Sequence, residues 1–126
     1  MNYVHLVAVL AIFQFFYFGI MVGRARGQYG VNAPATSGHE MFDRAFRIQM
    51  NTLEQLVCFL PALLLAAVYW PGTTIAAIGA VYLVGRFLYA RSYTQDPAKR
   101  GLGFGLSILP TFILLGAAGL GSVLNS

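Results

Sequence analysis

The chain has 126 residues, of which 58% are hydrophobic and 10% are charged, whereas about 25% of a typical soluble domain is charged. Eight Lys and Arg and four Asp and Glu residues cannot cover a soluble protein of this size, and a chain this apolar is not intrinsically disordered. The single cysteine, Cys58, excludes a disulfide-linked scaffold. The composition therefore indicates an integral membrane protein.

The charges are confined to two clusters, at residues 24–54 and 86–100, and the apolar stretch between them is broken at Trp70-Pro71-Gly72. We therefore predict an all-α integral membrane fold, a four-transmembrane-helix bundle that forms a single domain over residues 1–126. The first segment has no basic residue before it and its apolar stretch is too long for a signal peptide, so we expect a retained span. The predicted spans are about 3–26, 38–70, 73–94 and 97–123.

Two motifs predict where helices begin. Ser37-Gly38-His39-Glu40 matches the capping box S-x-x-E, which places the start of the second helix near residue 38. Asp96-Pro97 is typical of an N-cap followed by the first helical residue, which places the start of the fourth helix near residue 97.

The Lys and Arg residues lie in or beside the first and third connections, and the second connection and both termini have none. The positive-inside rule then places both basic connections, and any site near them, on the cytoplasmic side of a multi-pass protein. A bacterial inner membrane or the endoplasmic reticulum is the expected location. Arginines in or beside spans favour membrane lipids with anionic head groups and an anionic ligand as partners, not nucleic acid.

Polar side chains gather at one level of the second and third predicted helices. Arg47, Asn51 and Glu54 follow i, i+4, i+7 spacing and share one helix face. Counted from the turn at Pro71, Glu54 lies about 25 Å and Tyr89 about 27 Å along their helices, so antiparallel packing would bring them level near the basic side. The residues that share a face of the third helix are Tyr82, Arg86, Tyr89 and Tyr93.

Two interpretations fit this layer, because ionisable groups within a span need a partner or a cavity. The first is structural, with Arg47 or Arg86 paired with Glu54 between helices. The second is a ligand site, which the excess of Arg over Glu favours because Arg binds carboxylates through two hydrogen bonds. The second predicts a small zwitterion with surplus carboxylate, whose ammonium or amide group is held by Glu54 or Asn51.

Four short helices cannot shield so many polar groups alone, so we expect an oligomer, with the site between subunits. Small residues on the spans would allow close contact between helices. These small residues are Ala76, Ala80, Gly79, Gly85, Gly116, Gly119 and Gly121.

The segment from Phe42 to Glu54 resembles the F-x-R-x-x-R-x-Q-x-N-x-x-E signature of the MAPEG family, membrane-associated proteins in eicosanoid and glutathione metabolism. Ala33-Pro34-Ala35-Thr36 fits its first loop, and residues 85–93 and 96–100 look most like the type-3 microsomal glutathione S-transferase branch, bacterial-type homologues included. Gln55 stands where the leukotriene C4 synthase branch has tyrosine, which argues against eicosanoid-specific handling.

The resemblance covers about residues 24–105 and implies a homotrimer that binds glutathione, its co-substrate, between subunits. It implies that Arg100 acts on the glutathione thiol as the catalytic residue, and that the thiolate attacks a hydrophobic electrophile or reduces a lipid hydroperoxide. No metal is expected, since His5 and His39 are isolated. Together with Arg86 from the shared face of the third helix, the expected glutathione-binding residues are Arg26, Arg47, Gln49, Asn51, Glu54, Tyr89 and Tyr93.

Two other functions remain open at this point. One is a lipid-binding accessory protein of the same family that lacks catalysis, and the presence of Arg100 beside the binding set argues against it. The other is a small four-helix drug transporter, which needs a coupling carboxylate near mid-bilayer, whereas Glu54 is expected near one membrane face. Cys58 is expected to be a small packing residue rather than a redox switch.

Overall fold

The structure, a computed structural model, describes residues 1–125, so Ser126 at the end of the predicted domain lies outside the described residues. All four long helices are long and apolar enough to cross a membrane, and residues 1–125 contain no strand. The predicted all-α, four-transmembrane-helix class is therefore confirmed. The helices are α1 (Tyr3–Tyr29), α2 (Glu40–Tyr69), α3 (Gly72–Gln95) and α4 (Gly101–Leu124), with a short 3-10 helix, η1 (Pro97–Lys99), before α4.

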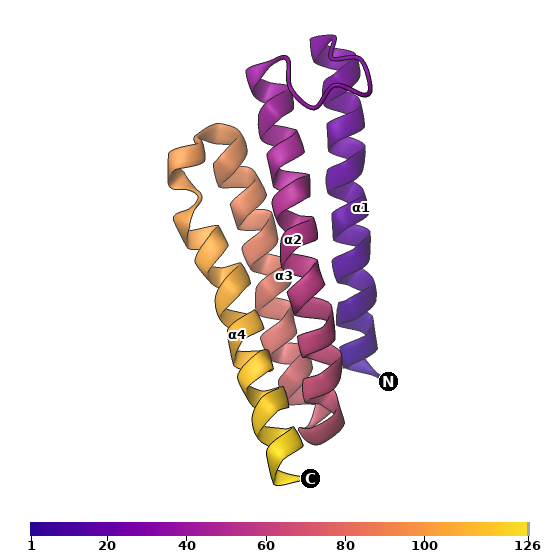
Figure 1. Cartoon of the computed structure of the whole chain (residues 1–126), viewed down its shortest axis with the longest axis vertical. Coiled ribbons are helices and arrows are strands. Elements are labelled where there is room, and N and C mark those ends of the chain that lie inside the picture. The colour runs from indigo at the N-terminus through magenta and orange to yellow at the C-terminus, as the bar shows by residue number, and fades with distance from the viewer. Residues whose placement is uncertain (126) are drawn as a thin grey trace.

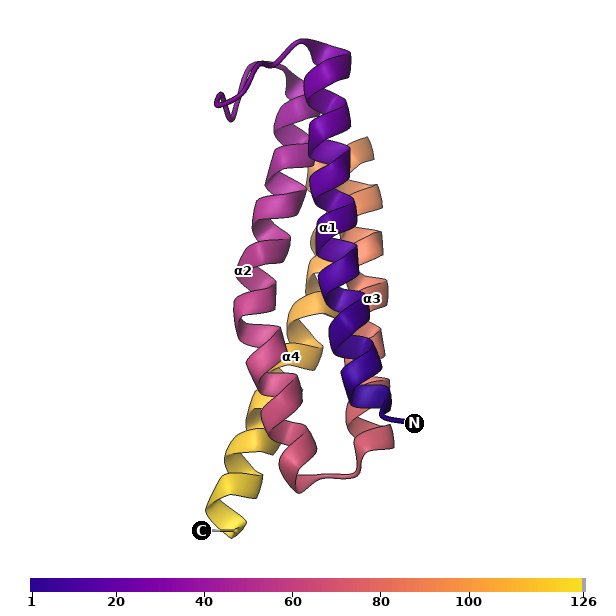
Figure 2. The ribbon, with the colours of Figure 1, turned by 90° about the vertical axis from the view of Figure 1, so that its right-hand side faces the viewer.

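Consecutive helices run antiparallel, and both termini lie at the same end of the bundle as the α2–α3 turn (Figure 1). The α1–α2 loop and the α3–η1–α4 connection lie together at the opposite end, so the two basic connections share one end of the molecule. At this end α1 and α2 extend beyond the turn between α3 and η1 (Figures 1 and 2). The resulting step leaves the first turns of α2 uncovered beside η1.

The capping box predicted for the second helix does not form. The Ser37 hydroxyl donates to Asp43 Oδ2 and the Gly38 N–H donates to Asp43 Oδ1, each at 3.1 Å, so Asp43 takes the role expected of Glu40. Glu40 forms an ion pair with Arg44 instead. The helix begins at residue 40 rather than 38, and His39 caps it by accepting the Met41 N–H at Nδ1.

The fourth helix also begins later than the sequence predicts. Asp96 acts as an N-cap, accepting the Ala98 N–H at 3.1 Å, but the helix that it caps is the three-residue η1. The α-helix itself begins at Gly101, one residue after Arg100. Arg100 therefore sits at the joint between η1 and α4, where the chain changes direction.

Glycines bring the backbones of α3 and α4 into direct contact. A Cβ atom on Gly85 would lie 2.6 Å from the carbonyl carbon of Leu106, and one on Gly103 would lie 2.2 Å from the backbone nitrogen of Tyr89. Near the opposite end, a Cβ on Gly121 would lie 2.5 Å from the Tyr69 side chain. The first two contacts hold Tyr89 and its neighbours on α3 tightly against α4, and the third holds α4 against α2.

Apolar side chains fill the bundle and also cover its outside. Phe18, Phe59 and Leu63 are buried, while Phe13 and Phe16 on α1 are more than half exposed. An apolar exterior of this kind fits a lipid environment. Polar contacts between helices are few but specific, among them the hydrogen bonds Gln14 Nε2 to Leu83 O and Trp70 Nε1 to Ala117 O, at 2.9 and 2.7 Å.

Candidate functional site

The side chain of Arg86 is fully buried and joins three helices. Its Nε donates to Ser107 Oγ on α4 at 2.8 Å, and its Nη1 donates to Asn51 Oδ1 on α2 at 2.7 Å and to Thr52 Oγ1 at 3.3 Å. The guanidinium carbon lies 4.3 Å from the centroid of the Tyr89 ring. Arg86, which the sequence places on the ligand face, is thus directed at neutral side chains inside the bundle.

Arg47 and Glu54 lie on the outer side of α2, on either side of the half-buried Asn51. Both are exposed, and neither has a hydrogen bond or ion pair within residues 1–125. The ion pair that the described residues contain joins Arg44 to Glu40, so pairing of Glu54 with Arg47 or Arg86 is not what the structure shows. Unpaired charges on a span indicate a partner from outside this chain.

Residues from three helices lie near Tyr89. Tyr89 is buried and stacks on the half-buried Tyr93, with 5.6 Å between ring centroids. Arg47 from α2 lines the same cleft as Tyr93, and Arg100 stands just before α4, whose Gly103 lies against the Tyr89 backbone. Arg100 is exposed, and its Nη1 donates to the Pro97 carbonyl at 2.8 Å. The fold therefore brings together Arg47, Tyr89, Tyr93 and Arg100.

Arg26 and Gln49 contact other parts of the chain. Arg26 Nη1 donates to the Ala35 carbonyl at 2.7 Å, and its guanidinium lies 4.8 Å from the centroid of the Phe42 ring, so it ties the α1–α2 loop to α2. The Gln49 amide packs on α1, with Nε2 2.9 Å from the position of a Cβ on Gly19. Within one subunit these two residues support the position of α2 rather than join the group around Tyr89.

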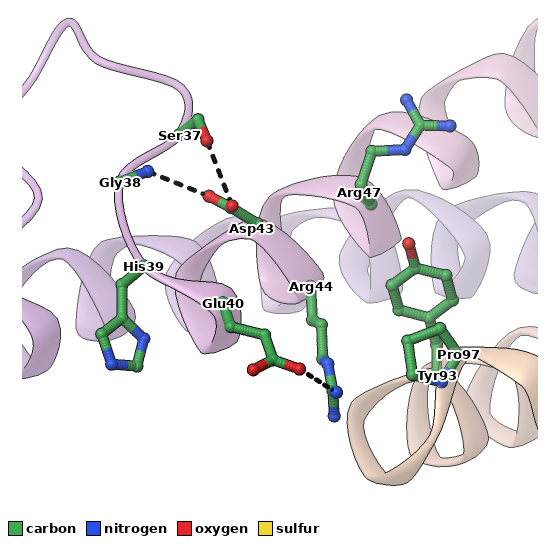
Figure 3. A pocket seen from close by; sticks show the side chains of 9 residues that line it. All are labelled: Ser37, Gly38, His39, Glu40, Asp43, Arg44, Arg47, Tyr93 and Pro97. Carbon is green, nitrogen blue, oxygen red and sulfur yellow. Dashed lines mark hydrogen bonds and ion pairs between the residues drawn. The ribbon is translucent and has the colours of Figure 1, made fainter.

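A cleft of about 480 Å³ opens at the step between the start of α2 and η1. Figure 3 shows Arg47 and Tyr93 beside each other at one side of this cleft, while Asp43 holds the loop at the other. Of the predicted site residues, Arg47 and Tyr93 line the cleft. The complete lining is Ser37, Gly38, His39, Glu40, Asp43, Arg44, Arg47, Tyr93 and Pro97.

Sequence reasoning assigned no role to Arg44, although it is part of the matched motif. Besides its ion pair with Glu40, its Nη1 donates to the carbonyls of Thr94 and Gln95 at 2.8 and 3.4 Å. Arg44 thus binds the C-terminal end of α3, where a cation is favoured by the helix dipole. Arg44 therefore anchors the wall of the cleft. The sequence signal that could have indicated this role is the cluster of charges in the first turn of α2, which lies beside the C-terminal end of α3.

Cys58 is exposed on α2, so the expectation that it packs inside the bundle is wrong for the single chain. Among residues 1–125, no three or more His, Cys, Asp or Glu side chains gather as a metal site would require.

The candidate site is a set of arginines and tyrosines, with Glu54 as its carboxylate, between the outer face of α2 and the start of α4.

The chain is similar to known proteins over most of its length. The chain is 50% identical to an uncharacterized protein of Synechocystis sp. over 87% of this chain and 80% of that protein. It is 40% identical to microsomal glutathione S-transferase 2 of Homo sapiens, over 90% and 79% of the two chains, and 34% identical to leukotriene C4 synthase of Cavia porcellus, over 91% and 77%. The MAPEG family model matches residues 4–120, and the chain belongs to the MAPEG family.

Proposed function

We propose that this protein is a membrane-bound glutathione transferase that conjugates glutathione to hydrophobic electrophiles. The observation that carries this proposal is the exposed, unpaired Arg47 and Glu54 flanking Asn51 on a membrane-spanning helix. Glutathione has two carboxylates and one ammonium group, so Arg47 would bind a carboxylate and Glu54 the ammonium. The names of the two mammalian relatives, a glutathione S-transferase and leukotriene C4 synthase, support the same reaction class.

The side-chain amide of Asn51 has a defined orientation in this proposal. Arginine can only donate hydrogen bonds, so the Asn51 oxygen faces Arg86 and its NH₂ group points away. Asn51 therefore offers donors to the ligand and suits a carboxylate or peptide carbonyl rather than the ammonium. Arg86 would serve glutathione binding from inside the bundle by orienting Asn51 and supporting the Tyr89 ring.

Arg100 would act on the sulfur. The thiolate is the nucleophile, and a nearby guanidinium favours it over the thiol, whose ordinary pKa is about 8.5. The thiolate attacks the electrophilic carbon, the C–S bond forms, and the displaced leaving group or opened ring takes up the negative charge. With a lipid hydroperoxide the thiolate cleaves the O–O bond to give the alcohol and a sulfenic acid, which a second glutathione converts to the disulfide.

The outer face of α2 would be covered by a neighbouring subunit in a homotrimer. Arg47 and Glu54 cannot face lipid alone without a large cost, and a site between subunits would complete their hydrogen bonding. The basic end of the bundle would lie on the cytoplasmic side of a bacterial inner membrane or the endoplasmic reticulum, so that glutathione enters from water and the electrophile from lipid.

The test is calorimetry with glutathione on the purified protein in detergent. Saturable binding is expected, and Arg47→Ala and Glu54→Gln should each weaken it by about tenfold or more, the scale of one charge-assisted hydrogen bond. Arg24→Gln, a change at an exposed arginine outside the site, is the control. Absence of binding would contradict the enzyme and favour the non-catalytic lipid-binding alternative. Assays with an aryl halide and with a lipid hydroperoxide then separate conjugation from peroxide reduction.

A further inference from the structure

α1 and α3 lie next to each other along one side of the bundle (Figure 2), and a long groove follows this side. It is made of three adjoining cavities of about 350, 280 and 250 Å³. The first and second share Tyr17 and Phe87 in their walls, and the second and third share Met21 and Thr94. We call this continuous depression the α1–α3 groove.

The two ends of the groove differ in chemistry. The first cavity is walled by apolar side chains and by Gln14, whose amide is buried and bonded to the Leu83 carbonyl. Towards the other end, Arg91 lines the second cavity and Arg24 lines the third, and both are exposed and without a hydrogen bond or ion pair in residues 1–125. The walls of the three cavities contain no Asp or Glu, so the positive charge at this end is not neutralised locally.

The charged and apolar ends of the groove match the positions of the head group and acyl chain of a membrane lipid. Its charged end lies at the basic end of the bundle, where the α1–α2 loop emerges, and its apolar end lies deeper along α1. Leu10 and Arg24 are separated by 14 residues of helix, or about 21 Å. Half of the hydrocarbon core is about 15 Å thick, so one acyl chain from the leaflet at the basic face can lie along the groove.

We propose that the α1–α3 groove binds an anionic phospholipid, with the phosphate between Arg24 and Arg91 and one acyl chain along Tyr17 and Phe87. Arginine pairs with phosphate through two parallel hydrogen bonds, which favours an anionic head over a neutral one. The third cavity, about 250 Å³, also reaches α2 through Met41 and Ala45, and with Gln28 in its wall it is larger than a bare carboxylate needs. It suits a phosphodiester with hydroxyl groups better than a free fatty acid.

Native mass spectrometry of the full protein tests this binding site. The protein in detergent is titrated with phosphatidylglycerol and, separately, with phosphatidylcholine of the same chains. Phosphatidylglycerol should bind more tightly, and Arg24→Gln/Arg91→Gln should reduce its affinity on the order of 10- to 30-fold, toward that of phosphatidylcholine. Both arginines are exposed and unbonded, so the variant is expected to fold, which its circular dichroism will verify.

Lys99→Gln is the matched control, because it removes a cation at the same end of the bundle from η1 rather than from the groove. Phosphatidylglycerol binding should survive this change. Equal affinity for the two phospholipids, or an equal loss in Lys99→Gln, would overturn the proposal in favour of diffuse surface charge. Displacement by oleate at concentrations equal to phosphatidylglycerol would also overturn it, with a fatty acid as the occupant.

Discussion

Arg86 reaches from α3 to Asn51 on α2, with 2.7 Å between Nη1 and the Asn51 side-chain oxygen. Arg86 is wholly inside the bundle, whereas Asn51 is half-buried between the exposed Arg47 and Glu54. This hydrogen bond therefore connects the core of the subunit to the face on which we propose glutathione binds. A change at Glu54 should therefore affect ligand binding alone, whereas a change at Asn51 should also affect stability.

Asn51→Leu should destabilise the fold, because it leaves Arg86 Nη1 with the longer bond to Thr52 alone. The expected loss is about 1–3 kcal/mol, the cost of an unsatisfied buried donor. Glu54→Gln should leave the thermal unfolding midpoint in detergent unchanged and weaken glutathione binding. Equal midpoints for the two variants would show that the contact between Arg86 and Asn51 carries no stability.

Gly103→Ala should disrupt the packing of α4 on α3, since the new methyl group would lie 2.2 Å from the Tyr89 backbone nitrogen. Overpacking of this kind costs about 1–3 kcal/mol or more. Gly105→Ala is the matched control on the same helix, because nothing lies within 4 Å of its Cβ position. Removing a helical glycine there should stabilise the protein by roughly 0.5–1 kcal/mol. Thermal unfolding compares the two, and similar midpoints would contradict the close approach.

Arg100→Ala should lower the ultraviolet absorbance of the bound glutathione thiolate and reduce turnover by roughly 100-fold, the usual loss when one group that stabilises developing charge is removed. Glutathione binding should largely survive in calorimetry. Arg100→Lys keeps the charge and should retain part of both signals. Unchanged turnover in Arg100→Ala would remove this residue from the mechanism.

Cys58 reports on whether the outer face of α2 is covered. The thiol is exposed in the single chain and lies one helical turn from Glu54. In the proposed trimer it should react with a maleimide much more slowly than Val84→Cys, an exposed position on α3, placed in a Cys58→Ser background. Similar rates in the assembled protein would mean that α2 faces lipid.

Much of the fold follows from hydropathy and the positions of charges. The four helices and the shared end of the two basic connections were predictable because lipid requires long apolar segments and turns stand out between them. The capping box was misassigned because the loop brings the Ser37 hydroxyl to Asp43, six residues away, rather than to Glu40, three residues away. A capping motif predicts which side chains could bond the first N–H groups of a helix, but the conformation of the loop determines which of them do.

The candidate site was only partly predictable for a similar reason. Helical spacing placed Arg86, Tyr89 and Tyr93 on one face of α3, which the structure reproduces. Spacing within one helix does not say how far that face is turned into the bundle, so Arg86 was expected at a ligand rather than bonded to Ser107. The groove between α1 and α3 also depends on how two helices meet, and no motif in either helix marks it.

The glycine contacts between α3 and α4 have a mechanical consequence. Backbones that touch at Gly85 and Gly103 can neither rotate nor slide past each other without atoms overlapping. The close approach therefore fixes the position of Arg86 and Tyr89 on α3 relative to the start of α4. A larger residue at either glycine would shift Arg86 and Tyr89 as well as the helix that carries it.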